Sequence, residues 1–161
     1  MSVPGTHSEP APLRPTHLRP RNILLVVAGG TLGTLARYWL ESAIPGPDGW
    51  PLPTLLINLA GAFLLGVLLE ALLRRGADQG ARRTVRLAAG TGFLGAFTTY
   101  STLAIEAVQL ADGHRLAGAV VYAVLSLLGG ALTATAGIWT ASIHHRRISG
   151  RRARAAAGAQ R

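Results

Sequence analysis

The chain has 161 residues, of which 49% are apolar and only 14% are charged. So few charges exclude an ordinary soluble domain, and the apolar residues fall into four runs long enough to cross a bilayer. The net charge is +9, every basic residue is arginine, and cysteine is absent, which excludes a disulfide framework and a thiolate metal site.

The N-terminal segment, residues 1–22, contains five prolines and few apolar residues. This composition predicts a disordered cytoplasmic segment, and the segment lacks the short apolar core of a signal peptide. A four-helix membrane domain is predicted to follow over residues 23–143. The remaining residues, 144–161, form a basic tail that we expect to lie in the cytoplasm, near the lipid surface.

The first span, predicted over residues 23–43, carries Gly29, Gly33 and Arg37 at four-residue intervals on one helix face. The two glycines predict a close contact with another helix. Arg37 stands near the end of the span, where two roles are open. Its side chain either reaches the membrane interface or raises the local concentration of anions in a vestibule.

The second span, predicted over residues 53–73, places Thr54 and Asn58 on one face, with Gly61 close to it. A lone asparagine in a membrane helix often only hydrogen-bonds a neighbouring helix. Polar residues in lipid are also costly and commonly mark function. The functional interpretation is therefore that Asn58 offers amide donors to an anion, and the sequence leaves both roles open.

The third span is predicted over residues 87–111 and has the most unusual composition. Gly90, Gly92 and Gly95 precede a run of hydroxyl residues, 98–102, and Glu106 follows. Both features disfavour an unbroken helix, and carbonyls freed by a break would suit a hard cation such as sodium. The alternative is a continuous helix whose glycines contact another helix.

The fourth span, predicted over residues 116–143, carries Tyr122, Ser126 and Thr133 on one face. These hydroxyl groups could form a track of hydrogen-bond donors. Alternatively, each could bond back to the backbone of its own helix.

The arginines are distributed unevenly around the four spans. Fourteen lie in the N-terminal segment, the loop between the second and third spans, and the C-terminal tail, whereas Arg115 alone lies on the other side. Because arginine-rich loops stay in the cytoplasm, both termini are predicted to be cytoplasmic. This placement beside apolar spans argues for a lipid environment and against nucleic acid as the partner of the positive charge.

Three motifs occur in order along the predicted spans. They read GGTLGTLARY over residues 29–38, TLLINLAGAFLLG over residues 54–66 and GFLGAFTTYST over residues 92–102. Together they resemble the fluoride channel family known as Fluc or CrcB. The resemblance covers residues 23–143 and implies an all-α integral membrane protein of a prokaryotic plasma membrane. It further implies four transmembrane helices with a broken third helix, assembled as an antiparallel dimer with two pores.

The resemblance also implies a function and a set of site residues. The function is passive export of cytoplasmic fluoride, with no enzymatic reaction and with a structural sodium ion, held by the backbone of Gly95 and Thr98, at the dimer centre. The residues implied along the fluoride pathway are Asn58, Tyr100, Ser101, Thr102, Tyr122 and Ser126, with Arg37 in a vestibule. Further candidates are Thr54, Leu103 and Glu106, of which Glu106 matches the family's third-span carboxylate.

The implied chemistry agrees with these residue types. Fluoride is small and strongly hydrated, so amide and hydroxyl donors must replace the water that it loses. A fixed cation nearby lowers the cost of burying an anion, and aromatic edges carry partial positive charge.

Two features depart from the family pattern. The family places two phenylalanines three residues apart after the break, where this chain has Tyr100 and Leu103, and leucine has no ring to face an anion. An antiparallel homodimer also needs one sequence inserted in both orientations, which the arginine distribution opposes. The sequence therefore raises the hypothesis of a related, oppositely oriented partner subunit that supplies the missing aromatic groups.

Two other functions fit four spans. Leu103 is compatible with a non-conducting or partner-dependent subunit of a heterodimeric channel. A small multidrug exporter would also have four spans and antiparallel pairing, but it needs a carboxylate deep in its first span, and Glu41 lies at the end of that span.

Overall fold

The computed structural model describes the backbone of residues 19–159 and the side chains of residues 19–146 apart from Asp48. Throughout this part of the chain the regular elements are helices, with no strand. They are α1 (Pro20–Ala43), the short 3₁₀ helix η2 (Pro47–Gly49), α2 (Leu52–Leu73), α3 (Ala81–Val85), the π-helix η3 (Arg86–Leu94), α4 (Gly95–Phe97), α5 (Tyr100–Asp112) and α6 (Leu116–Ala159). Most of the segment predicted to be disordered lies outside the described residues, and α1 already begins at Pro20.

Three helices of the described chain are long and apolar enough to cross a membrane, namely α1, α2 and the Leu116–Arg146 part of α6. Only 11–17% of the most apolar stretch of each is buried within the chain. Apolar helices with so much exposed surface require lipid or protein around them, so the chain is an all-α, multi-pass membrane protein. These helices coincide with the first, second and fourth predicted spans to within three residues at each end.

The third apolar region is built from shorter pieces. The helices α3, η3 and α4 follow one another without interruption as far as Phe97. Thr98 and Thr99 are extended, with φ/ψ of −82°/154° and −144°/126°, and α5 begins at Tyr100. The two pieces thus meet at the hydroxyl-rich run that the sequence singled out.

Helix α1 packs directly on the backbone of η3. A methyl group on Gly29 would overlap the carbonyl of Ala88, and one on Gly33 would overlap the carbonyl of Phe93. A Cβ on Gly92 would lie only 2.7 Å from the carbonyl oxygen of Val26. The predicted close contact at the Gly29 and Gly33 face is therefore confirmed, with a π-helix as its partner.

Helix α2 packs on α6 in a similar manner. A methyl group on Gly66 would overlap the carbonyl of Ala134, and one on Gly137 would overlap the carbonyl of Phe63. Beyond these glycines the hydroxyl of Ser142 donates to Glu70 Oε1 at 2.8 Å, which adds a polar contact between the two helices. This packing fixes the position of α6 relative to α2 along most of the bilayer depth.

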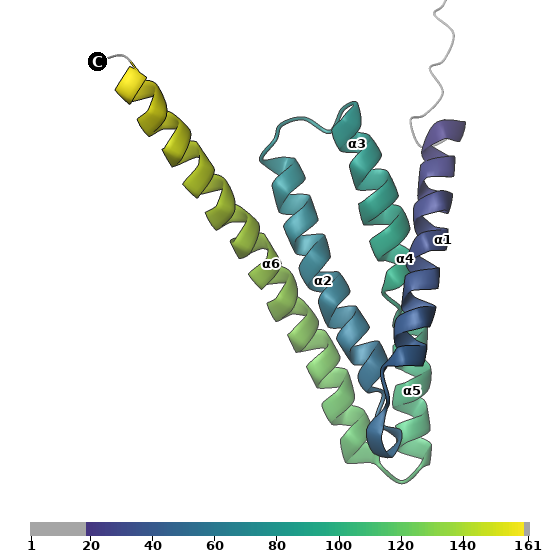
Figure 1. The fold of residues 1–161 in the computed structure, drawn as a ribbon. Helices are drawn as coiled ribbons and strands as arrows, with labels where there is room; N and C mark the ends of the chain where they lie inside the picture. Colours follow the sequence, from purple (N-terminus) through teal and green to yellow (C-terminus); the bar gives the residue numbers. More distant parts are fainter. Residues whose placement is uncertain (1–18, 160–161) are drawn as a thin grey trace, which may run out of the picture.

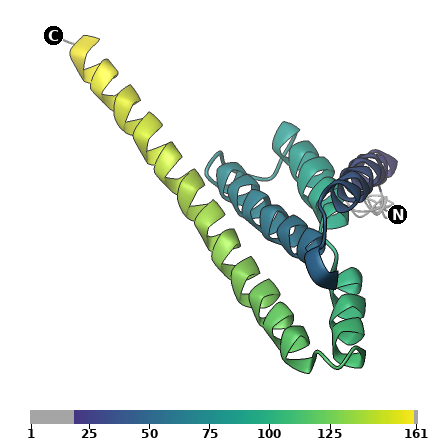
Figure 2. The ribbon, with the colours of Figure 1, turned by 60° about the horizontal axis from the view of Figure 1, so that its bottom comes forward.

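The chain runs up and down between two ends (Figure 1). The beginning of α1, the connection between α2 and α3, and the far part of α6 lie at one end, while η2 and the α5–α6 turn lie at the other. Figure 2 shows α6 continuing well beyond the other helices. At 1.5 Å per residue its 44 residues are about 66 Å long, roughly twice the hydrocarbon thickness of a bilayer. The predicted C-terminal tail therefore continues α6 as far as Ala159.

Candidate functional site

The interruption between α4 and α5 is held by the side chain of Asn58 on α2. Its Nδ2 donates to the carbonyl of Thr99 at 2.9 Å, and its Oδ1 accepts from the Thr99 backbone N–H at 2.8 Å. Both backbone groups of Thr99 are thereby satisfied by one amide, as a neighbouring strand would satisfy them. Asn58 thus forms the helix-to-helix contact that the sequence offered as one of its two roles.

Thr99 also begins the next helix. Its Oγ1 accepts from the Thr102 backbone N–H at 3.2 Å and lies 3.2 Å from Ser101 Oγ, while its own hydroxyl donates to Thr102 Oγ1 at 3.0 Å. These are the contacts of a helix N-cap, which supply acceptors for otherwise unpaired N–H groups. Ser101 and Thr102, predicted on the pathway, are therefore gathered around Thr99.

The same hydrogen bonds change the surroundings of two carbonyls. In a continuing α-helix, the Thr99 N–H would donate to Gly95 and the Thr102 N–H would donate to Thr98. Here the first N–H donates to Asn58 and the second to the Thr99 hydroxyl. The carbonyls of Gly95 and Thr98 are thus released from the helical pattern.

A second polar cluster joins α2, α5 and α6. Glu106 Oε1 accepts from the hydroxyl of Thr54 at 2.7 Å, and Oε2 accepts from the hydroxyl of Tyr122 at 2.6 Å. Thr54 is 2% exposed and Tyr122 is fully buried, packed with Leu110 and Ala119. Two residues that the sequence left as further candidates, Thr54 and Glu106, therefore lie in direct contact with the predicted pathway residue Tyr122.

Ser126 lies one helical turn beyond Tyr122 on α6. Its hydroxyl is buried and has no hydrogen-bond partner among the described residues. Thr133 behaves differently, because its hydroxyl donates back to the carbonyls of Gly129 and Gly130. The hydroxyl groups of α6 therefore do not share one role.

A surface pocket of about 430 Å³ reaches the Glu106 cluster from the end of the molecule that holds η2 and the α5–α6 turn. Its walls are formed by the η2 loop and by the facing parts of α5 and the turn, and its lining includes Trp50, Glu106, Gln109 and Arg115. Water and ions at this end can thus approach the Glu106 carboxylate.

Three predicted site residues lie away from these hydrogen bonds. Arg37 pairs with Glu41 on its own helix, with Nε and Oε1 3.9 Å apart. Tyr100 is 79% exposed, so its ring faces away from the chain. Leu103 is partly buried against the Tyr122 cluster.

Thr99 is a site residue that the sequence predictions missed. A signal was available, because a threonine at a helix start often serves as the N-cap. Its hydroxyl oxygen then accepts from the backbone N–H three residues later, which is here that of Thr102. Trp50 and Gln109 were also missed, since the η2 loop and the last turns of α5 are distant in sequence and meet only in the fold.

The chain matches known proteins over most of its length. The family described as CrcB-like protein, Camphor Resistance (CrcB), matches residues 24–138. The chain is 48% identical over 124 residues to "Fluoride-specific ion channel FluC 2" of Leifsonia xyli subsp. xyli, covering 77% of this chain and 86% of the relative. It is 49% identical over 117 residues to "Fluoride-specific ion channel FluC 1" of Cutibacterium acnes, covering 72% and 82%.

A further relative extends the range of organisms. "Fluoride-specific ion channel FluC" of Bordetella petrii is 46% identical over 118 residues, covering 73% of this chain and 89% of the relative. The matched region contains most of α1, all of α2, the interrupted third region and most of the apolar part of α6. On this evidence, the chain belongs to the CrcB family.

Proposed function

We propose that this chain is a subunit of a fluoride channel that lets fluoride leave the cytoplasm passively across the plasma membrane. The observation that carries the proposal is the concentration of hydroxyl and amide donors where α2, α5 and α6 meet, in a chain whose relatives are named fluoride channels. No covalent step is required, because an ion that crosses only exchanges water for protein donors.

The donors form a sequence of contacts for fluoride. One N–H of the Asn58 amide bonds to Thr99, and the other is left to donate to an anion. Ser101 and Thr102 lie beside it at the start of α5, and Tyr122 and Ser126 follow on α6. Charge-assisted hydrogen bonds from such groups compensate the loss of water around fluoride.

Glu106 sets a condition on this pathway. Both of its oxygens accept from hydroxyl groups, and Tyr122 cannot donate to fluoride while it donates to Glu106. A passing fluoride must therefore replace the carboxylate as the acceptor of the Tyr122 hydroxyl. We expect Glu106 to turn toward the pocket beside Gln109 when this happens.

A structural sodium ion is proposed at the released carbonyls of Gly95 and Thr98. Carbonyl oxygens suit a hard cation, and the described residues offer no cluster of three acidic, histidine or cysteine side chains for a metal. One chain offers two such oxygens, and a two-fold axis beside them would provide four. A cation there would favour fluoride nearby through its positive charge.

The proposed assembly is an antiparallel dimer with four spans per subunit, the third being α3–η3–α4 and α5 with a break at Thr98 and Thr99. The exposed ring of Tyr100 supports a partner on this side, because it would then be covered and could face an anion. Two subunits related in this way would give two pores.

The test is fluoride efflux from liposomes that contain the purified full-length chain. We expect fluoride to leave down its gradient without a proton gradient, and chloride to be retained. Absence of fluoride efflux, both alone and with a co-purified related subunit, would overturn the proposal. Efflux in sodium-free N-methylglucamine buffer tests the cation separately, and we expect it to fall.

A second candidate is a subunit that conducts only with a partner. Leu103 supports it, because an aliphatic side chain stands against the Tyr122 cluster where the family pattern has a ring. Leu103→Phe should then create efflux in an otherwise silent single-chain preparation. Robust efflux from the unmodified chain alone would rule this candidate out.

A further inference from the structure

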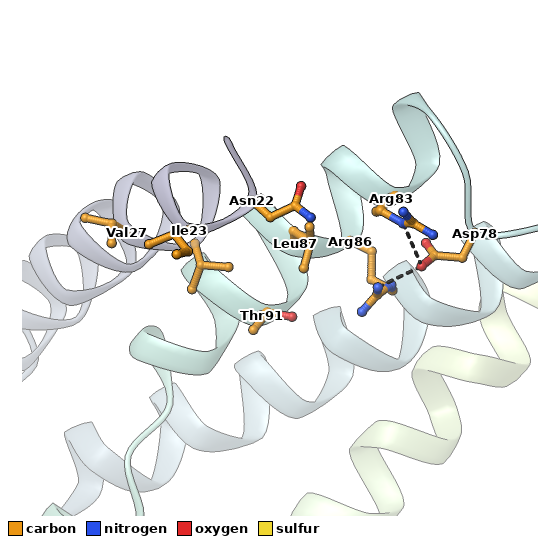
Figure 3. A pocket seen from close by; sticks show the side chains of 9 residues that line it. Asn22, Ile23, Val27, Asp78, Arg83, Arg86, Leu87 and Thr91 are labelled. Carbon is orange, nitrogen blue, oxygen red and sulfur yellow. Dashed lines mark hydrogen bonds and ion pairs between the residues drawn. The ribbon is translucent and has the colours of Figure 1, made fainter. Parts of the chain in front are cut away.

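Two adjoining pockets form one groove where α1 begins. The smaller, about 160 Å³, is lined by Arg19, Arg21 and Arg83, together with Asn22, Gly80 and Thr84. The larger, about 530 Å³, shares Asn22 and Arg83 and continues along α1 and η3 (Figure 3). Neither pocket contacts the Asn58 or Glu106 clusters, so the groove is separate from the proposed pathway.

The outer part of the groove is strongly basic. Arg19, Arg21, Arg83 and Arg86 contribute four positive charges. Among the described residues, Asp78 is the only acidic one that lines either pocket, and it pairs with Arg86 at 2.7 Å and with Arg83 at 3.7 Å. The hydrogen bond from Arg86 holds the pKa of Asp78 below its usual range, so this carboxylate stays charged at neutral pH. A net charge of +3 remains.

The inner part of the groove is apolar. It is lined by Ile23, Val26, Val27 and Leu87, and Ile23 and Val27 are 48% and 57% exposed. Arg19 and Val27 are eight residues apart, which is a rise of about 12 Å along the helix axis. This rise is close to the distance from lipid headgroups into the acyl region. The groove thus changes from basic to apolar along the axis of a helix that crosses the membrane.

We propose that this groove binds one anionic phospholipid from the leaflet at the arginine-rich end of the molecule. The guanidinium groups of Arg19, Arg21 and Arg83 would hold the phosphate, because arginine matches its oxygens in number and geometry. The acyl chain would cover Val27 and Leu87. Basic pockets beside transmembrane helices bind lipid headgroups in this way, and the apolar continuation favours a lipid over free phosphate.

The test is native mass spectrometry of the full-length protein in neutral detergent, titrated with phosphatidylglycerol or with phosphatidylcholine of the same acyl chains. We expect each chain to retain one phosphatidylglycerol in preference to phosphatidylcholine. The double variant Arg19→Gln/Arg21→Gln should weaken this preference by about 25-fold, since each arginine near a lipid surface contributes about fivefold. Arg75→Gln/Arg146→Gln removes the same charge at the same end, outside the groove, and should retain the preference.

A second pair of variants separates the possible ligands. Val27→Ser/Leu87→Ser should weaken phosphatidylglycerol binding while leaving any binding of inorganic phosphate unchanged. If inorganic phosphate competes as well as the lipid does, or if the two arginine pairs behave alike, the proposal is overturned. It is also overturned if the Arg19→Gln/Arg21→Gln variant changes only the dimer fraction, because the groove would then hold a second copy. Lipid binding is measured without ion flux, so this outcome is independent of fluoride conduction.

Discussion

At the scale of single residues, Glu106 accepts two short hydrogen bonds from hydroxyl groups on two other helices. The donors, Thr54 and Tyr122, are both buried. A partly buried carboxylate depends on such donors for its charge to be tolerated. The cluster therefore stabilises the packing of α2, α5 and α6, and under the proposed function Tyr122 would also donate to fluoride.

Tyr122→Phe tests both contributions. The change removes the hydroxyl that donates to Glu106, and leaving a partly buried acceptor unpaired costs about 1–3 kcal/mol. We expect a lower melting temperature in detergent and a marked loss of fluoride efflux. Tyr38→Phe, on an exposed ring, is the control and should change neither.

Ser126→Ala tests a hydroxyl that, unlike that of Tyr122, has no partner among the described residues. Its removal should leave the melting temperature unchanged or slightly raised, because an unpaired buried polar group is lost. If fluoride uses the hydroxyl, efflux should nevertheless fall. Thr135→Val, which removes a hydroxyl bonded only within α6, should leave efflux unchanged. Unaltered efflux in both variants would remove Ser126 from the pathway.

At the scale of helices, close backbone contacts position the site. Gly61 on α2 lies opposite the interruption, where a methyl group would overlap Thr98 Cγ2 and lie 3.3 Å from Phe97 Cδ1. The smallest side chain is required at this position because α2 must approach Thr99 closely enough for Asn58 to bond both of its backbone groups.

Gly61→Ala should therefore disturb the interruption. Forcing an extra methyl into a close contact costs about 1–3 kcal/mol, and we expect the melting temperature and fluoride efflux to fall together. Gly130→Ala is the matched control, because nothing lies within 4 Å of a Cβ built there. Removing a glycine from that helix should raise stability by up to about 1 kcal/mol. Equal effects of the two variants would contradict the role given to Gly61.

At the scale of the whole molecule, most of the described arginines lie at the same end of the helices. The described arginine-rich segments lie at the end that holds the start of α1 and the α2–α3 connection (Figure 1). The other end has Arg115. This arrangement predicts a single orientation in the membrane, with the arginine-rich end in the cytoplasm.

Single cysteines test this orientation in a chain that has none of its own. In intact cells, a membrane-impermeant maleimide should label Gly113→Cys in the α5–α6 turn but not Ala77→Cys in the α2–α3 connection. Permeabilised cells provide the control, and both variants should then be labelled. Partial labelling of both in intact cells would show two orientations and would remove the argument for an obligate partner subunit.

Much of this architecture followed from local patterns. The apolar runs predicted α1, α2 and the membrane part of α6 because bilayer thickness fixes the length of a spanning helix. The spacing of Gly29 and Gly33 predicted a close contact, although it did not identify η3 as the partner. The pairing of Glu106 with Thr54 and Tyr122 was not predicted, because it joins residues 52 and 16 positions apart in the chain.

The membrane environment, three of the predicted spans and the family followed from the amino-acid sequence, because hydrophobic length, arginine placement and short motifs are local properties of the chain. Tertiary structure alone decided what the polar residues do. Asn58 bonds to Thr99, Arg37 pairs with Glu41, and the hydroxyl of Ser126 has no partner within the described part of the chain. The physical reason is that a polar side chain in a membrane takes the partner that the neighbouring helix brings within hydrogen-bonding distance, and only the packing of helices specifies that partner.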